Sequence, residues 1–198
     1  MAIFFFMKIY VLVLSLVIIL SVSAQENIAL SANEQAEALR NTLKADSDNL
    51  VALTNLGLLE LAARNYRDAE KFLKRAVRVR METASAWLGL GTLYMDERRD
   101  IEAFAALAQA ALYSPDNPHV HNFLGVIYSR RGWSDAAEAS LRRAVELNPS
   151  YTDAHFNLAV FYLGRDKPLI EPAKRHYYRA LDLGATKDDI IEGKLKEK

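Results

Sequence analysis

The chain has 198 residues, of which 51% are apolar and 25% charged, and its 25 basic residues balance its 25 acidic residues. This length suits one globular domain or a short repeat array, and the balanced charge implies neither a nucleic-acid partner nor an acidic one. Because the chain has no Cys, it has no disulfide, no thiol nucleophile and no thiolate metal site.

Residues 1–24 have the features of a secretory signal peptide. Lys8 precedes an apolar run over residues 9–20, and the small residues at 22–24 suit a signal peptidase. We therefore predict cleavage after Ala24 and export of the rest of the chain.

The alternative for the same segment is an uncleaved membrane anchor. Residues 4–20, interrupted by one Lys, come close to the ~20 residues that a membrane-spanning helix needs. Both interpretations limit membrane association to residues 1–24. The predicted location is the periplasm, with inner-membrane anchoring facing the periplasm as the alternative.

Residues 25–49 are predicted to form an N-terminal helix and a linker. Apolar residues recur at helical spacing at Ala36, Leu39 and Leu43. The polar run from Asp46 to Asn49 then ends the helix.

A sparse pattern of apolar and small residues recurs every 34 residues after this linker. In its clearest copy it reads Trp87, Leu90, Gly91, Tyr94, Ala103, Leu107, Ala110 and Pro115. One period later the same positions hold His121, Leu124, Gly125, Tyr128, Ala137, Leu141, Ala144 and Pro149. One period earlier they hold Leu53, Leu56, Gly57, Glu60, Ala69, Leu73, Ala76 and Met81, and a further copy begins with His155, Leu158, Ala159 and Tyr162.

This pattern resembles the signature of the tetratricopeptide repeat (TPR) family, a 34-residue unit of two helices, A and B, joined by a tight turn. The resemblance implies an all-α fold, a right-handed α-solenoid of about four units with an N-terminal helix and a C-terminal capping helix. The predicted array covers residues 50–183. Its units are residues 50–83, 84–117, 118–151 and 152–185, and residues 186–198 form the C-terminal cap.

Two local features refine this prediction. Gly57, Gly91 and Gly125 lie in the middle of helix A, where Gly costs about 1 kcal/mol relative to Ala, so a close approach of helix B is expected. The fourth unit has a longer turn with Pro168 and Pro172, so its helix B is expected to start near Pro172.

The last helix is expected to carry a capping box. Thr186 and Asp189 have the required spacing, and Ile190, Ile191 and Leu195 are expected on one side of this helix. We expect it to cover the apolar face of the last unit, because terminal repeats need a cover.

In the TPR family, positions 2, 5, 9 and 12 of helix A line the concave groove that receives ligands. Carried onto this chain, the resemblance gives these predicted partner-binding residues: Thr54, Leu58, Leu88, Thr92, Met95, His119, Asn122, Val126, Ser129, Asp153, Phe156 and Val160. Charge is scarce among them, so they lack the basic clamp that holds a terminal carboxylate in some relatives. We expect an amphipathic helix or an extended apolar peptide in the groove. The alternative is that these residues pack within the superhelix or against the N-terminal helix.

A second candidate surface lies on the outer side of helix B in the second unit. The first and third units carry charges at these positions, whereas the second unit has the predicted convex contact residues Ile101, Phe104, Ala108 and Leu112. An exposed apolar patch of this kind marks a contact site, for a partner or for self-association. The alternative is coverage by neighbouring side chains.

No pattern in the chain supports catalysis. We find no nucleophile elbow, phosphate loop or zinc-protease helix, and the four His residues lack the acidic neighbours of a metal site. The prediction is therefore no catalytic residue, no cofactor, no metal and no nucleic-acid partner.

The predicted function is a non-enzymatic protein–protein interaction scaffold of the bacterial cell envelope. It would bind a peptide or helix in the concave groove and a second partner on the convex side. The alternative is a chaperone-like holder of exported or membrane-bound clients.

Overall fold

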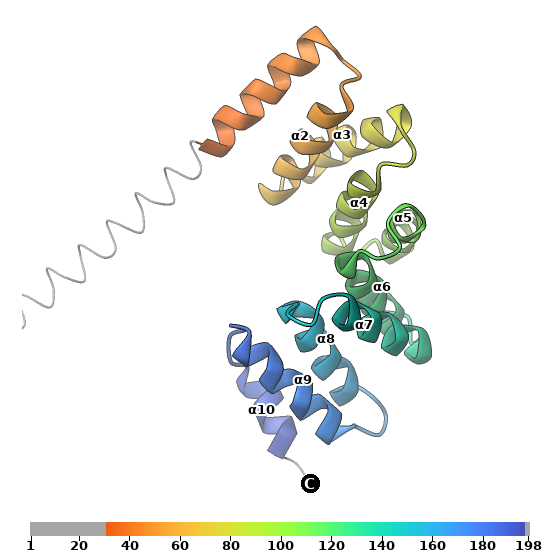
Figure 1. Cartoon of the computed structure of the whole chain (residues 1–198), viewed down its shortest axis with the longest axis vertical. Helices are drawn as coiled ribbons and strands as arrows, with labels where there is room; N and C mark the ends of the chain where they lie inside the picture. Colours follow the sequence, from red (N-terminus) through yellow and green to blue (C-terminus); the bar gives the residue numbers. More distant parts are fainter. Residues whose placement is uncertain (1–30, 197–198) are drawn as a thin grey trace, which may run out of the picture.

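A computed structural model describes residues 31–196, and this part of the chain contains helices and no strand (Figure 1). Residues 31–45 are helical. The signal peptide or anchor predicted for residues 1–24 lies outside the described residues.

Helices A and B alternate along the rest of the chain. They are α2 (Leu50–Ala62), α3 (Tyr66–Val79), α4 (Ala84–Asp96), α5 (Asp100–Tyr113), α6 (Pro118–Arg130), α7 (Ser134–Leu147), α8 (Thr152–Leu163), α9 (Ile170–Asp182) and α10 (Asp189–Lys196). The predicted all-α solenoid of four helical pairs with a helix at each end is confirmed.

Local sequence signals set the starts of two A helices. The side chain of Asn49 caps α2 by accepting a hydrogen bond from the Ala52 amide at 3.0 Å. Asn117 caps α6 in the same way through the His119 amide at 2.9 Å. Pro118 follows as the first helical residue, where its missing N–H costs nothing.

In the first three units, helix A packs closely on its own helix B at the mid-helix glycine. A Cβ atom on Gly125 would lie 2.5 Å from Leu141 Cγ, and one on Gly91 would lie 2.6 Å from Leu107 Cδ2. The expected close approach of helix B is therefore present. Leu107 and Leu141 are buried at these contacts and form part of the core.

The A helices form the inner layer of the curved stack. Among the described residues, α2 packs on α4, α4 on α6 and α6 on α8, whereas the B helices make no equally extensive contacts with one another. Helices that lie closer together occupy the inside of a bend. The A helices therefore line the concave side and the B helices the convex side (Figure 1).

The helix at residues 31–45 occupies the register of a B helix, one period before α3. Its Arg40 reaches Glu60 of α2, with Nη2 2.6 Å from Oε1. Positions that are Ala, Leu and Ala in α3 are Gln35, Leu39 and Thr42 here. This more polar face suits the end of an array.

The fourth unit has the enlarged turn that its length predicts. The amide of Leu169 donates to the Tyr162 carbonyl at 3.1 Å and closes this turn. Pro172 lies in the first turn of α9, where Pro is tolerated, so the expected start of this helix agrees with the structure.

The cap of α10 differs from the sequence prediction. Asp188, not Thr186, caps the helix, because its Oδ1 accepts hydrogen bonds from the amides of Ile190 and Ile191 at 2.9 and 3.0 Å. Ile191 and Leu195 are buried as expected. Ile190 is instead 74% exposed, because it lies on the opposite side of the helix from these two residues.

Candidate functional site

The clearest repeated feature of the concave side is a row formed by position 9 of each A helix. Leu58, Thr92, Val126 and Val160 follow one another at intervals of 34 residues. Leu58 is 36% exposed and Val160 is 46% exposed, and the other two are half-buried. The row therefore presents small and branched side chains along the inside of the stack.

Other predicted groove residues border this row. His119, Ser129 and Asp153 are exposed, and Leu88 and Phe156 are half-buried. Leu88 and Val126 pack against the main core, and the Phe156 ring lies 6.3 Å from that of Tyr177. Packing within the superhelix, which was the alternative, therefore accounts for part of the stripe.

Three predicted groove residues are buried and do not form part of the accessible surface. Thr54 is 5% exposed, Met95 9% and Asn122 1%. Thr54 Oγ1 donates to the Leu50 carbonyl at 2.8 Å, so its hydroxyl is satisfied within α2. Direct contact of these three residues with a ligand stays a prediction, and in this structure their side chains are covered.

Asn122 belongs to a buried polar network behind the groove. Its side-chain amide donates to Tyr151 Oη at 3.3 Å, and its Oδ1 accepts from Asn157 Nδ2 at 2.9 Å. His119 Nδ1 lies 2.9 Å from the same Tyr151 oxygen. Burial, and secondly the charge of Asp153, raises the pKa of Tyr151 to about 12, so the phenol keeps its proton. It can therefore donate to His119, which fixes the exposed imidazole of this residue.

Three of the four A helices have an aromatic residue near their start, and it makes the same contact in each of the three. Trp87 Nε1 donates to the Met81 carbonyl at 2.7 Å. His121 Nε2 and His155 Nε2 lie 2.6 and 3.1 Å from the carbonyls of Pro115 and Pro149. A carbonyl can only accept, so both imidazoles carry a proton on Nε2. These two His residues therefore bind the loop before their own A helix, at the boundary between two units.

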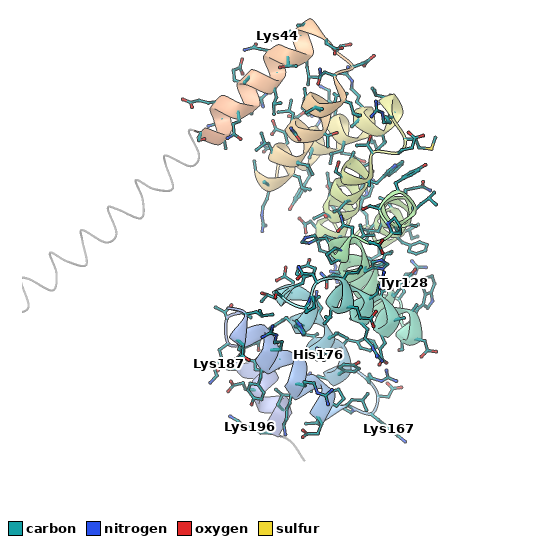
Figure 2. All side chains as sticks on the ribbon, viewed as in Figure 1. Lys44, Tyr128, Lys167, His176, Lys187 and Lys196 are labelled. Atoms are coloured by element: carbon teal, nitrogen blue, oxygen red, sulfur yellow. The ribbon has the colours of Figure 1, made fainter. Side chains whose placement is uncertain are left out.

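His155 forms a pair with His176 of α9, labelled in Figure 2, with the two Nδ1 atoms 3.0 Å apart. Burial lowers the pKa of His155, and burial together with the neighbouring His155 lowers that of His176 to about 4. Both rings are therefore neutral at pH 7. Within residues 31–196, no three His, Asp or Glu side chains are grouped so that they could hold a metal ion.

A hollow of about 800 Å³ lies between the α6–α7 turn and the enlarged turn of the fourth unit. Ser129 and Val160, two predicted groove residues, line it together with Gly132, Lys167 and Leu169. The longer turn thus forms one wall of this hollow.

The convex patch is only partly as predicted. Ile101 and Leu112 are 71% and 67% exposed, whereas Phe104 and Ala108 are half-buried. The Phe104 ring lies 6.0 Å from that of Trp133, in an edge-on arrangement. The Trp133 ring thus covers part of Phe104, as the alternative of coverage by neighbouring side chains expects. The role of Phe104 as a contact residue stays a prediction.

Sequence reasoning missed Trp133, which is 45% exposed. A signal was available, because Trp133 lies one period after Arg99 and so places an aromatic ring where the preceding unit has a cation.

No helix within residues 31–196 is long and apolar enough to cross a membrane.

Comparison with family profiles identifies tetratricopeptide repeats at residues 54–119 and again at residues 118–151. These matches cover the first three units of the array. They confirm the repeats that the 34-residue period predicts.

Two curated relatives share this region. Superkiller protein 3 of Schizosaccharomyces pombe is 29% identical over 144 residues, which is 73% of this chain and 10% of that protein. Protein O-mannosyl-transferase Tmtc3 of Drosophila melanogaster is 29% identical over 130 residues, which is 65% of this chain and 14% of that protein. The chain therefore spans only a small part of the length of either relative.

Solved structures share the fold. A crystal structure of MamA is 25% identical, with a TM-score of 0.65 over 75% of this chain and 85% of that one. YrrB, a TPR protein with an unusual peptide-binding site, is 24% identical, with a TM-score of 0.63 over 80% and 82%. The thermophilic TPR protein TTC0263 of Thermus thermophilus is 23% identical, with a TM-score of 0.64 over 85% and 92%.

Proposed function

Because the chain contains tetratricopeptide repeats, we propose that it is a non-enzymatic interaction scaffold of the bacterial cell envelope that binds a peptide or helix of another protein in its concave groove. The row of Leu58, Thr92, Val126 and Val160 is the observation that carries this proposal. The row offers exposed apolar side chains at its two ends, Leu58 and Val160, with half-buried Thr92 and Val126 between them. Such a surface suits the apolar face of a helix or the alternating side chains of an extended peptide.

The polar residues beside the row fit the same role. His119 is exposed, and its ring is held in place by Tyr151. A fixed donor next to an apolar row adds a directional contact at little entropic cost, since the imidazole is already ordered. A rigid stack that presents such a surface binds by preorganisation and needs no chemical step.

The test is recovery of partners from envelope fractions by crosslinking and pull-down. We expect Leu58→Glu with Val160→Glu to lose the partners, because charge then replaces the exposed ends of the row. Ile190→Glu is the matched control, since Ile190 is an apolar residue of similar size, 74% exposed on α10 and outside the groove. Recovery of the same partners with the double variant would reject binding in the groove.

The convex side is proposed as a second contact surface, for another protein or for a second copy through the second unit. Ile101 and Leu112 support this proposal, because both are large apolar side chains, 71% and 67% exposed, on the same face of α5. Sedimentation of Ile101→Lys with Leu112→Lys tests self-association without disturbing the packed Phe104 ring. An unchanged oligomeric state in this variant would reject self-association through these residues.

The envelope location rests on the sequence of residues 1–24 alone. We propose a periplasmic protein whose signal peptide is removed after Ala24. Mass spectrometry of the mature N-terminus tests this, and an intact apolar segment in the membrane fraction would favour the anchor. The chaperone-like alternative predicts broad, weak peptide binding without a stoichiometric complex.

A further inference from the structure

A groove on the convex side runs between α3 and α5, with α4 as its floor. It encloses about 480 Å³, and its apolar lining consists of Val77, Met81, Trp87, Leu90, Ala105 and Ala106. Met81 is 57% exposed at its edge. The groove lies on the opposite side of the stack from the row of Leu58, Thr92, Val126 and Val160.

The α3 wall of this groove is basic. Lys74 and Val77 of α3 line the groove, and three further cations, Arg67, Lys71 and Arg78, lie on α3 beside this lining, on the side of Lys74 away from Val77. Only Lys74 is neutralised there, by Glu70, with Nζ 2.7 Å from Oε1. The other three form no ion pair with any residue in 31–196 and are exposed.

The opposite wall lacks basic residues altogether. Helix α5 has Asp100 and Glu102 in its first turn and no Lys or Arg along its length. Both acids form ion pairs within the chain. Asp100 Oδ1 lies 3.2 Å from Arg130 Nη1, and Glu102 Oε1 lies 3.0 Å from Arg99 Nε. Beyond them this wall is formed by Ala105, Ala106 and Gln109. The groove therefore has an apolar floor and one wall of small side chains that ends at the paired Glu102. The cation that lines its other wall, Lys74, is paired with Glu70, and three unpaired cations of α3 flank it.

The corresponding surface of α7, two periods later, has the opposite character. The positions of Arg67, Glu70, Lys71, Lys74 and Arg78 are there Asp135, Glu138, Ala139, Arg142 and Glu146. Three acids and one cation replace four cations and one acid. The combination of basic wall and apolar floor is thus a local property of α3 and α5 and does not follow from the repeat itself.

We propose that this groove binds an acidic amphipathic helix of a partner protein, with large apolar side chains on the Trp87 floor and carboxylates facing α3. The charge of the α3 wall selects this occupant, because unpaired cations beside an apolar groove complement a helix with one apolar and one acidic side. A symmetric contact with a second copy would bring two basic α3 faces together, which like-charge repulsion opposes. The inference rests on the proposed role of the convex side as a contact surface and names its partner class.

The fluorescence of Trp87 reports whether the groove is occupied. The chain has two Trp residues, so in a Trp133→Phe background Trp87 is the only one. The probe is a synthetic peptide of about 18 residues, or about five helical turns, with Leu on one helical face and Glu on the other. We expect saturable binding with a change in Trp87 emission. Replacing Glu by Lys in the peptide should abolish binding, and about 0.5 M NaCl should weaken it.

Matched variants locate the contact. Lys71→Glu with Arg78→Glu should weaken peptide binding at least about tenfold, because two charge pairs become repulsive, and Met81→Glu should do the same through the floor. Ala139→Glu, at the position of Lys71 on α7, should leave the affinity unchanged. Leu58→Glu with Val160→Glu should also leave it unchanged, so failure of the concave proposal and failure of this one are distinguishable. Circular dichroism checks that each variant is folded.

Several results would overturn the proposal. Absence of peptide binding would do so, as would equal binding by wild type and the α3 variant. Binding to phosphatidylglycerol vesicles but not to the peptide, lost in the same α3 variant, would assign the surface to a membrane. A dimer in sedimentation equilibrium that this variant dissociates would assign it to a second copy.

Discussion

Two neighbouring junctions of the stack use the same three positions with different chemistry. Where α3 meets α4, Tyr94 Oη donates to Glu70 Oε1 at 2.9 Å, and Arg99 lies over the Tyr94 ring with its guanidinium carbon 4.3 Å from the ring centre. Arg99 Nη2 also lies 3.5 Å from Glu70 Oε1. We call Glu70, Tyr94 and Arg99 the polar triad.

One period later, where α5 meets α6, all three positions are aromatic. Phe104 replaces the Glu and Trp133 the Arg around Tyr128, which is labelled in Figure 2. The ring centres lie 5.8 Å apart for Phe104 and Tyr128, 6.0 Å for Phe104 and Trp133, and 5.7 Å for Tyr128 and Trp133. We call these residues the aromatic triad.

The third junction, where α7 meets α8, is polar again, but its cation comes from a different position in the repeat. Tyr162 Oη donates to Glu138 Oε1 at 3.1 Å, and Arg165 of the enlarged turn reaches Glu138 Oε2 at 2.9 Å. The repeat therefore fixes where three side chains meet at each junction but leaves their chemistry free. An aromatic junction buries more apolar area, whereas a polar junction depends on charge and hence on salt and pH.

The largest difference is expected on truncating the B-helix member of each triad. Phe104→Ala should lower the free energy of unfolding by about 3 kcal/mol, because two ring contacts and their apolar area are lost. Glu70→Ala, at the same position one unit earlier, should cost about 1 kcal/mol, since its partners remain partly solvated. Urea unfolding measures both. Equal losses would contradict the assignment of different chemistry to the two junctions.

Introducing Glu and Arg at positions 104 and 133 tests whether a polar triad forms at any junction that has the right residue types. Phe104→Glu by itself should destabilise strongly, because a carboxylate then faces Tyr128 and Trp133. Adding Trp133→Arg restores the Glu, Tyr and Arg of the other junctions, and a double-mutant cycle should show about 1 kcal/mol of favourable coupling. Zero coupling would show that the backbone of this junction does not place the three side chains as the other junction does.

The sequence predicted the fold because the repeat signature consists of residues that pack within a unit. The Gly and Leu at the positions of Gly125 and Leu141 meet in the first three units, so their spacing alone implies two close helices. The same reasoning could not separate buried from exposed groove residues. Asn122 shares its helical stripe with Val126, but Tyr151, just before α8, and Asn157 of α8 form hydrogen bonds with it and cover it.

Contacts between units were beyond sequence reasoning for a physical reason. The patch at Ile101 and Leu112 was found by comparing the outer positions of helix B between units, which needs only the repeat period and the period of a helix. Coverage of Phe104 by Trp133 depends on a turn two elements later. The basic wall of the α3 groove was visible in the sequence, but the floor formed by Trp87 and Met81 was not.

The two junctions should also differ in their response to acid. Burial raises the pKa of Glu70, but hydrogen bonds from Lys74 and Tyr94 outweigh it and leave the pKa below its ordinary value of 4.5. A carboxyl with a lowered folded pKa stabilises fully above its unfolded pKa and loses that contribution as the pH falls through the folded pKa. Wild type should therefore lose more stability than Glu70→Gln on going from about pH 6 to about pH 3.

The control is the aromatic junction. The stability difference between wild type and Phe104→Ala should not vary over the same pH range, because the aromatic triad contains no carboxyl and no imidazole. Chemical unfolding at several pH values measures both comparisons. A Glu70→Gln curve parallel to that of wild type would show that the polar triad does not depend on the Glu70 charge.

The smallest effect concerns the turn residue just before the third triad member. Arg98 precedes Arg99 with φ of 61°, and Gly132 precedes Trp133 with φ of 75°. Only Gly adopts this left-handed conformation without steric cost, but Gly also adds entropy to the unfolded chain. Arg98→Gly should therefore stabilise by about 0.5 kcal/mol, and Gly132→Ala should destabilise by about 1 kcal/mol. Midpoints of urea unfolding compare the two. A destabilising Arg98→Gly would mean that the Arg98 side chain makes a contact worth more than the relief of its backbone, and that the two turns differ in more than this one residue.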